Sequence, residues 1–301
     1  MRYAIGVDLG GTNIKAARVS EDGAILDHAS GQTRDGAATS TWVTTVGELL
    51  QRLQPPGGER AAGIGVAAPG LAAADGRSVL YMRGRLAGLQ GLDWAEALGA
   101  TVPVAVLNDA HAGLLGEAWT GAAAGAREAV LLTLGTGVGG AILTGGRILT
   151  GATGKAGHWG HVTLDADGPP SIAGMPGSLE AAIGNYTVAE RSGGRFHDTR
   201  DLVAAHLAGD AEASAVWLRS VHRLACAVAS IVNALDPEIV IVGGGIARAG
   251  PALFEPLSGF LDAVEWRPLG RGVRVVPAAL GEMAGAIGAA RSVLMAAPAG
   301  A

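Results

Sequence analysis

The dipeptide Asn108–Asp109 lies where an apolar, strand-like run ends and a helical pattern begins. A carboxylate at such a junction can take the proton of a hydroxyl group, and the neighbouring amide can hydrogen-bond the same hydroxyl. A helix N-cap is the alternative interpretation, because Asn and Asp are both common at that position. Asp8 ends an earlier strand-like run, where it is placed to hold Mg²⁺ directly or through water. A base and a magnesium ligand are two of the parts that phosphoryl transfer needs.

Two glycine turns are candidate sites for phosphate groups. They occur in the parallel stretches "GVDLGGTNIKAA" and "LTLGTGVGGAIL", about 125 residues apart. Glycine amides approach an anion closely because no Cβ blocks them, and threonine hydroxyls add donors. Each turn leads into a second strand-like run instead of a helix, which excludes a dinucleotide fingerprint and a P-loop. The expected phosphate contacts are Gly10, Gly11, Thr12, Asn13 and Lys15 in the first turn and Gly135, Thr136 and Gly137 in the second.

A third turn, formed by Gly243, Gly244 and Gly245, follows a predicted strand over residues 238–242. Here the glycines do open a helix. They allow a ribose or a flat ring to lie against bare backbone, and an ordinary strand-to-helix turn explains them equally well. Both interpretations stay open at this point.

The order of these elements predicts an α/β fold with mixed sheets. Residues 3–7 and the run "IKAARV" are typical of strands, a "DG" hairpin signal follows them, and a long helix is predicted over residues 215–235. Recurrence of this plan indicates a duplicated unit, with two halves facing each other across a cleft. The expected division is a smaller N-terminal domain over residues 1–110, completed by a C-terminal helix over 283–298, and a larger domain over 111–282.

Composition limits the partners. The net charge is −5, and no run of like charges occurs, which argues against nucleic acid or an anionic membrane as the main partner. No stretch has the roughly 18 uninterrupted apolar residues that a membrane helix needs, and "MRYAIGVDLGG" lacks the regions of a signal peptide, so we expect a cytoplasmic location. The single cysteine, Cys226, cannot form an internal disulfide and is expected in the core.

Taken together, the motifs resemble those of the ROK family (repressor, open reading frame, kinase) in the actin-like ATPase superfamily. The stretches that carry the resemblance are "GVDLGGTNIK", "GIGVAAPG", "LNDAHAGLLGEA", "LTLGTGVGGAIL", "IVIVGGGI" and "LGEMAGAIGAA". The resemblance implies a duplicated ribonuclease-H-like fold, ATP with Mg²⁺ in the cleft, and transfer to a sugar hydroxyl. It also implies that Asp109 is the general base, that Asn108 contacts the sugar, and, by analogy, that the chain forms a homodimer.

The family includes repressors, which carry a DNA-binding element ahead of the first strand, whereas this sequence reaches its first strand within about three residues of Met1. We therefore expect no DNA-binding role. A catalytically silent sugar sensor is the remaining alternative outside the enzymes, although Asp109 and both phosphate turns are intact.

The loop "GHWGHVTLDADGPPSIAGMPGSLE" departs from the family pattern in two ways. His161 and Glu180 match a histidine and a glutamate that bind the sugar, but the three zinc-binding cysteine positions fall on Ser171, Ala173 and Ser178. Since tetrahedral zinc needs imidazole, thiolate or carboxylate ligands, we expect no zinc here. Asp165 and Asp167 lie nearby, and together with the histidines they are an alternative set of ligands for some metal.

The second departure is His158, which stands where the family has a sugar-binding glutamate. A neutral imidazole offers one donor and one acceptor, whereas an ionised carboxylate only accepts, so the preferred ring should change. Arg85 in "RLAGL" replaces a family asparagine that lines the sugar pocket, and Gly70 is expected to line the same pocket. The sequence therefore predicts an ATP-dependent kinase for a primary hydroxyl of a hexose or a C7-cyclitol. Alternatives are a conventional glucokinase, a kinase for an amino or acetylated hexose, and polyphosphate in place of ATP.

Overall fold

The computed structural model describes residues 1–36, 39–55, 57–82 and 84–296. By its internal contacts the chain forms two compact units. Unit 1 comprises Met1–Gly125, Arg147–Ala156 and Ala279–Ala301, and unit 2 comprises Ala126–Gly146 and Gly157–Ala278. The chain first leaves unit 1 after Gly125, later than residue 110, and the division expected from the sequence stays a prediction.

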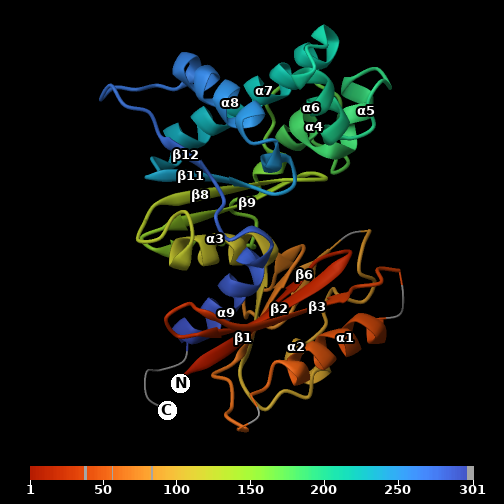
Figure 1. Cartoon of the computed structure of the whole chain (residues 1–301), viewed down its shortest axis with the longest axis vertical. Helices are drawn as coiled ribbons and strands as arrows, with labels where there is room; N and C mark the ends of the chain where they lie inside the picture. The colour runs from red at the N-terminus through yellow and green to blue at the C-terminus, as the bar shows by residue number, and fades with distance from the viewer. Residues whose placement is uncertain (37–38, 56, 83, 297–301) are drawn as a thin grey trace. The chain divides into compact units, whose positions relative to one another are not determined.

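Unit 1 is built on a five-stranded sheet with the order β3-β2-β1-β4-β7 (Figure 1). The first three strands form an antiparallel meander, and β1 then pairs in parallel with β4, as β4 does with β7. Every residue of β1 except Asp8 is buried, because the sheet is covered on both faces. The bounds are β1 Tyr3–Leu9, β2 Asn13–Ser20, β3 Ile25–Gln32, β4 Ile64–Ala68 and β7 Val104–Asn108.

The second sheet repeats this plan with the order β10-β9-β8-β11-β12. Strand β8 is antiparallel to β9 and parallel to β11, which is parallel to β12, as in the first sheet. The expected duplication is therefore confirmed, and the fold is the duplicated ribonuclease-H-like one. The bounds are β8 Ala129–Leu134, β9 Val138–Thr144, β10 Arg147–Ile148, β11 Ile239–Gly243 and β12 Arg274–Pro277.

The C-terminal helix α9 (Ala284–Ala296) packs on strands β1 and β4 and on helix α3 (Asp109–Thr120) (Figure 1). Glycines permit the close approach. A Cβ on Gly6 or Gly65 would overlap a carbonyl oxygen of α9, and a Cβ on Gly288 would overlap the carbonyl oxygen of Ala112 in α3. Helix α9 matches residues 284–296 of the helix predicted over 283–298, whereas Met283 belongs to the preceding 3-10 turn and positions 297 and 298 lie outside the described residues.

Glu117 joins the end of α3 to the segment that enters α9. Its buried carboxylate accepts hydrogen bonds from the backbone amides of Ala122 at 2.7 Å, Ala279 at 3.1 Å and Leu280 at 2.9 Å. A buried carboxylate is tolerated when its lone pairs are filled in this way. Glu117 thereby fixes where α9 starts, and hence how α9 meets the strand that carries Asp8.

Smaller elements complete unit 1. Trp42 of helix α1 and Trp94 of helix α2 are fully buried against the sheet, with ring centroids 5.6 Å apart. Asp93 caps α2 by accepting from the amide of Glu96. The bounds are α1 Thr39–Arg52, β5 Leu71–Ala72, β6 Val79–Tyr81, α2 Trp94–Ala97 and the 3-10 turn η4 Gly281–Met283.

In unit 2, helices α7 and α8 cover one face of the sheet (Figure 1). Trp217 of α7 is buried, and its indole nitrogen donates to the carbonyl of Ala252 in α8 at 2.9 Å. The bounds are η1 Trp159–His161, α4 Leu179–Ile183, η2 Asn185–Thr187, α5 Val188–Arg191, α6 Thr199–Leu207, α7 Ala211–Leu235, η3 Ile246–Ala249 and α8 Pro251–Val264.

Among the described residues, α7 is the one helix long and apolar enough to cross a membrane by length and composition. Half of its apolar window is buried inside the structure, with Val221 and Leu224 packed in the core, which is typical of a core helix. Cys226 also lies in α7 and is half-buried.

Candidate functional site

The first glycine turn connects β1 to β2 in unit 1. The amide of Gly10 donates to the carbonyl of Asn13 at 3.1 Å, so the turn closes on itself. Thr33 holds it from outside, because its hydroxyl donates to the carbonyl of Gly10 at 2.6 Å and its amide to that of Thr12 at 2.9 Å. Thr33 is completely buried. No motif marks Thr33, since only the pairing of β2 with β3 brings it to the turn.

Asp8 lies one residue before the end of β1, close to this turn, and pairs across the sheet with Lys15. Burial and, to a smaller extent, the charge of Asp109 raise the pKa of Asp8 from its ordinary value of 3.8 to about 7, although the charge of Lys15 opposes this rise. The first turn of α9 also approaches Asp8, since a Cβ on Gly285 would lie 2.7 Å from its carboxyl carbon. A buried carboxyl group next to a second carboxylate favours a cation, and Mg²⁺ is commonly held by one or two carboxylates plus phosphates and water. The residues present therefore fit the metal.

We expect the substitution Asp8→Asn to stabilise the metal-free protein at pH 8 and to leave its stability at pH 4 nearly unchanged. The folded pKa lies above the ordinary value of 3.8. Ionising Asp8 therefore disfavours the folded state increasingly as pH rises from about 4 through 7, and asparagine removes this cost. Urea unfolding in the presence of a chelator measures the difference. Equal effects at the two pH values would contradict the assignment.

Asn108 and Asp109 lie at the junction of β7 and α3. The side-chain oxygen of Asn108 accepts from the amides of Ala110 at 3.0 Å and His111 at 3.2 Å, so the helix-cap interpretation is confirmed. Its side-chain nitrogen donates to the carbonyl of Gly70 at 2.9 Å, which leaves one further N–H of that nitrogen for a substrate. Through this hydrogen bond Gly70 orients the side chain of Asn108.

Asp109 is exposed, and one of its carboxylate oxygens accepts a hydrogen bond from the amide of Ala110 at 2.8 Å.

Arg85 lies against the first glycine turn. A Cβ on Gly11 would overlap its guanidinium group, and its Nε lies 3.3 Å from a carboxylate oxygen of Asp35. The family resemblance predicts that Arg85 lines the sugar pocket, and it does not predict the contact of Arg85 with the first glycine turn.

The second glycine turn, in unit 2, connects β8 to β9. The amide of Gly135 donates to the carbonyl of Gly137 at 3.0 Å, and the amides of Asn185 and Tyr186 donate to the carbonyls of Gly135 at 2.9 Å and Thr136 at 3.1 Å. Unlike the first turn, this one is held by backbone from a following helical segment. It occupies the position in the second sheet that the first turn has in the first sheet, and its role as a phosphate site stays a prediction.

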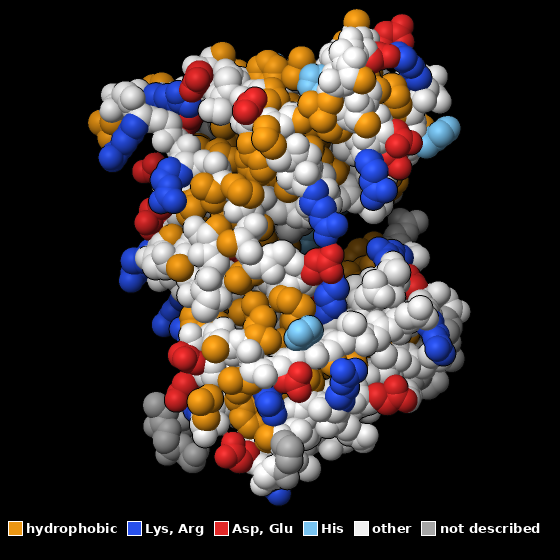
Figure 2. Space-filling model, in the orientation of Figure 1, with side chains coloured by type: hydrophobic (Ala, Val, Ile, Leu, Met, Phe, Trp, Pro, Cys, Tyr) orange, Lys and Arg blue, Asp and Glu red, His pale blue; other side chains and the backbone are white. Residues whose placement is uncertain are grey.

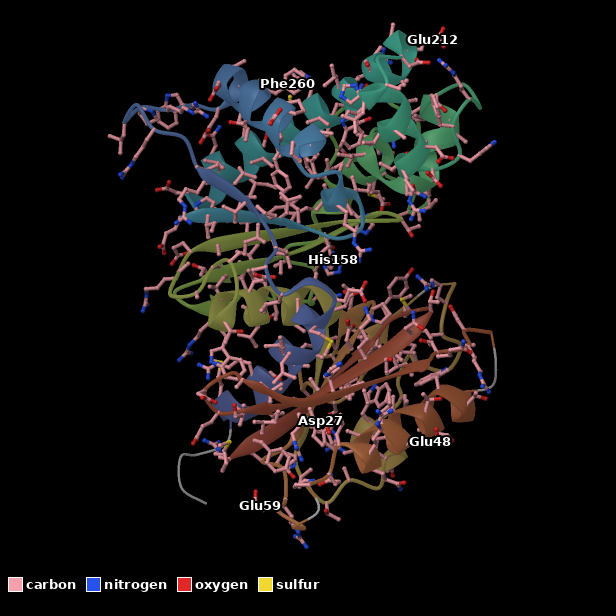
Figure 3. All side chains as sticks on the ribbon, in the orientation of Figure 1. Asp27, Glu48, Glu59, His158, Glu212 and Phe260 are labelled. Carbon is pink, nitrogen blue, oxygen red and sulfur yellow. The ribbon has the colours of Figure 1, made fainter. Side chains whose placement is uncertain are left out.

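Glu180 lies directly beside the second turn, because a Cβ on Gly137 would lie 2.7 Å from one of its oxygens. The other oxygen is 3.6 Å from Nδ1 of His161, a distance too long for a hydrogen bond. Burial raises the pKa of Glu180, and the charge of His161 opposes this effect. The ring of His158 stacks on that of His161, with centroids 6.3 Å apart, and Figure 3 labels His158 on the segment that leads into η1. The three predicted sugar contacts of unit 2 thus form one cluster.

The loop that replaces the family's zinc site is held by serine hydroxyls. Ser171 accepts from the amides of Ala173 at 3.2 Å and Met175 at 3.3 Å, and Ser178 caps α4 by accepting from the amide of Ala181 at 3.2 Å. These oxygens serve the backbone and do not provide the donor set that zinc needs. The absence of zinc stays a prediction.

The alternative metal site also lacks a ligand cluster. Within the described part of the chain, no group of three or more His, Cys, Asp or Glu side chains could hold a metal ion. Asp165 lies 3.4 Å from Arg223 and accepts from the amide of Asp167 at 3.2 Å. The two oxygens of the Asp165 carboxylate are therefore engaged by local contacts.

The third glycine turn borders a cavity of about 660 Å³ in unit 2. Gly244 has φ of +86° and packs on the carbonyl of Leu134 at the end of β8, a position that suits glycine. The Thr199 hydroxyl is buried and has no hydrogen-bond partner among the described residues. The residues that line the cavity are Gly135, Thr136, Asn185, Asp198, Thr199, Arg200, Val203, Ala204, Leu207, Gly245, Ile246, Arg248 and Ala249. The sequence prediction missed Asn185 and Thr199, which carry no recognisable motif.

Each unit thus gathers its own part of the predicted site. Unit 1 brings together Asp8, the first turn, Asn108 and Asp109, and unit 2 brings together the second turn, Glu180 and both histidines.

Two ribonuclease-H-like sheets with a glycine turn at the same place in each define a protein of the actin-like ATPase class. The ROK family model matches residues 4–295, and the chain belongs to the ROK family. One relative is a glucokinase from Halalkalibacterium halodurans, 35% identical over an alignment of 312 positions that covers 95% of this chain and 93% of the relative.

Two further proteins extend the comparison. An N-acetylmannosamine kinase from Shigella boydii is 30% identical, with 81% of this chain and 84% of the relative covered. The crystal structure of a ROK glucokinase from Streptomyces griseus in complex with glucose and AMPPNP superimposes with a TM-score of 0.78 at 26% identity, covering 96% of this chain and 98% of that one.

Proposed function

We propose that this ROK protein transfers the γ-phosphoryl group of ATP to a primary hydroxyl of a hexose or a hexose-like carbocycle, with Asp109 as general base. Membership of a family with glucokinases and an N-acetylmannosamine kinase makes it a phosphotransferase that acts on sugars. The observation that carries the finer proposal is Asp109, exposed at the start of α3 and close enough to Asp8 to raise its pKa.

In the proposed reaction the hydroxyl oxygen of the sugar attacks the γ-phosphorus, and the bond from that phosphorus to the bridging oxygen of ADP breaks. Asp109 accepts the hydroxyl proton. Asp8 would hold Mg²⁺, which neutralises charge on the β- and γ-phosphates. The glycine turns at Gly10 and Gly135 bind the phosphates through hydrogen bonds from backbone amides.

The nucleotide is proposed to occupy the 660 Å³ cavity in unit 2. The third turn offers bare backbone to the ribose or base, so we favour binding over a purely structural turn. Thr199 lines this cavity, and its hydroxyl is buried without a hydrogen-bond partner among the described residues. ATP use is supported by the AMPPNP complex of the Streptomyces griseus relative, and polyphosphate remains an alternative donor.

The sugar is proposed to contact Asn108, His161, Glu180 and His158. Because His158 replaces a family carboxylate, a C7-cyclitol or a modified hexose is our first choice of acceptor. Glucokinase activity is the second candidate and is supported by the glucokinase from Halalkalibacterium halodurans. Activity on an acetylated hexose is supported by the N-acetylmannosamine kinase from Shigella boydii. On the face drawn in Figure 2, Lys and Arg side chains intermingle with Asp and Glu, which supports a small-molecule partner over nucleic acid or an anionic membrane. A cytoplasmic homodimer is part of the proposal.

A panel of hexoses, acetylated hexoses and cyclitols with MgATP tests the proposal. ADP release that depends on one acceptor class identifies the substrate. If a sugar binds by calorimetry but none is phosphorylated, the silent sensor is the correct alternative and the kinase proposal fails.

We expect His158→Glu to shift the ranking of acceptors towards glucose by about tenfold in relative kcat/KM, since one hydrogen bond is gained or lost for each ring. Competition assays with paired substrates measure the ratio. The matched control is His28→Glu, at an exposed histidine of β3, which should leave the ranking unchanged. An unaltered ranking in His158→Glu would remove this residue from the specificity argument.

A further inference from the structure

We propose that Arg85 is a phosphate-binding side chain that stabilises the transferred phosphoryl group, and not a contact to the sugar. This inference rests on the proposed kinase function and adds a positively charged group to it. It is carried by the place where unit 1 holds the guanidinium group: against the first glycine turn.

The contact between Arg85 and the turn is direct. A Cβ on Gly11 would overlap Nη2 and Cζ of Arg85 and would lie 3.0 Å from Nε. The guanidinium group therefore fills the space beside Gly11 that any other residue would occupy. Because Gly11 has no side chain, the guanidinium group of Arg85 and the backbone amides of the turn lie next to one another. An anion bound to those amides would meet the guanidinium group at the same place.

Two contacts hold Arg85 in this position. Its Nε lies 3.3 Å from Oδ2 of Asp35, and Oδ1 of Asp35 accepts from the amide of Leu86 at 2.8 Å. The same hydrogen bond from Leu86, followed by Arg85 itself, lowers the pKa of Asp35. Leu86 is 1% exposed, with φ of +49°, so its buried side chain anchors the segment. The carboxylate holds the Nε side of the fork, and Nη2 is the atom that reaches the turn.

The chemistry of the group suits this role. A guanidinium fork binds phosphate oxygens through two parallel N–H donors and keeps its charge at every working pH. About half of the Arg85 side chain is exposed, so it is accessible to a ligand. Lys15, a basic side chain of the strand that follows the turn, is paired with Glu282 at 3.0 Å. With Nη2 beside Gly11, Arg85 thus provides a positive charge that offsets the negative charge of the transferred phosphoryl group in the transition state.

The two roles predict different kinetics. A group that stabilises the transferred phosphoryl lowers kcat when it is removed, whereas a sugar contact raises KM for the sugar. For Arg85→Ala we expect kcat to fall about 10²-fold, with KM for the sugar changed by less than about threefold. Arg85→Asn, which introduces the family residue, should behave like alanine, and Arg85→Lys should recover only part of the rate because it lacks the fork.

Arg77→Ala is the matched control. Arg77 is also an exposed arginine of unit 1 and lies 2.6 Å from the carboxylate of Asp93, which caps a backbone amide as Asp35 does. Its loss should leave kcat within about twofold of the wild type. Added guanidinium chloride at millimolar concentration should restore part of the rate of Arg85→Ala and none to an Asp109 variant. A purely structural role of Arg85 would not respond to it.

A raised KM for the sugar with an unchanged kcat, or full activity in Arg85→Asn, would overturn the inference and restore the sugar contact. If the wild type phosphorylates no acceptor, the kinase proposal fails separately, and calorimetry with MgATP still decides on Arg85. We then expect Arg85→Ala to weaken MgATP binding about tenfold relative to Arg77→Ala. Equal affinities would refute phosphate binding by Arg85.

Discussion

Replacing Asp109 by asparagine should lower kcat by about 10²- to 10⁴-fold, the range over which a positioned general base contributes. Asparagine keeps the shape of the side chain, and its carbonyl oxygen can still accept the hydrogen bond from Ala110 that the aspartate accepts at 2.8 Å. The helix should therefore start at the same residue, and only the ability to take a proton is lost. Steady-state turnover and thermal unfolding of the same preparation separate the two properties.

The control for this substitution is Asp27→Asn, at an exposed position of β3 that Figure 3 labels. It removes one carboxylate from the same unit and should leave turnover unchanged. Turnover of Asp109→Asn within about threefold of the wild type would show that another group takes the proton. Low turnover with a lowered unfolding temperature would instead point to damage at the junction of β7 and α3.

The second large effect is expected from Gly288→Ala, which should lower the free energy of unfolding by about 3 kcal/mol or more, or prevent folding. The added Cβ would overlap the carbonyl oxygen of Ala112, and this oxygen belongs to the backbone of α3 and cannot rotate away. Helices α9 and α3 would have to separate, and α9 also packs on β1 next to Asp8.

Gly47→Ala in α1 is the matched control, because a Cβ there meets nothing within 4 Å. Glycine is costly inside a helix, so this variant should gain about 0.5–1 kcal/mol. Urea unfolding monitored by circular dichroism measures both. A neutral Gly288→Ala would mean that α3 and α9 are less closely packed than the structure shows.

The fold was largely predictable because its signals are local. The strand at residues 3–7 extends to Leu9, the predicted helix from 215 begins at Ala211, and the glycine turns fall between the expected strands. The "DG" signal was informative because a hairpin needs φ above zero, and Gly23 has φ of +92°. Duplication followed from two stretches of similar pattern, and the equivalent strand orders confirm it.

The site was less predictable because its supports are distant in sequence. Thr33 reaches the first turn only through the pairing of β2 with β3, and Glu117 binds amides more than 160 residues later in the chain. For Asn108, the local sequence pattern left a helix cap and a substrate contact as alternatives, and the structure shows that its side chain caps α3. No motif links Arg85 to Gly11, since that contact depends on how the intervening segment folds back.

The return of the C-terminal helix to unit 1 has a consequence for how the protein is made. Strands β1 and β4 are synthesised before unit 2, but α9, which covers them, is synthesised after it. Unit 2 lies between these segments in the chain and has its own core, so it can fold first. Strand β1, which carries Asp8, then stays partly uncovered until residues 284–296 have been synthesised and can pack on it. Assembly of the phosphate-binding end of unit 1 is therefore a step that follows the synthesis of unit 2.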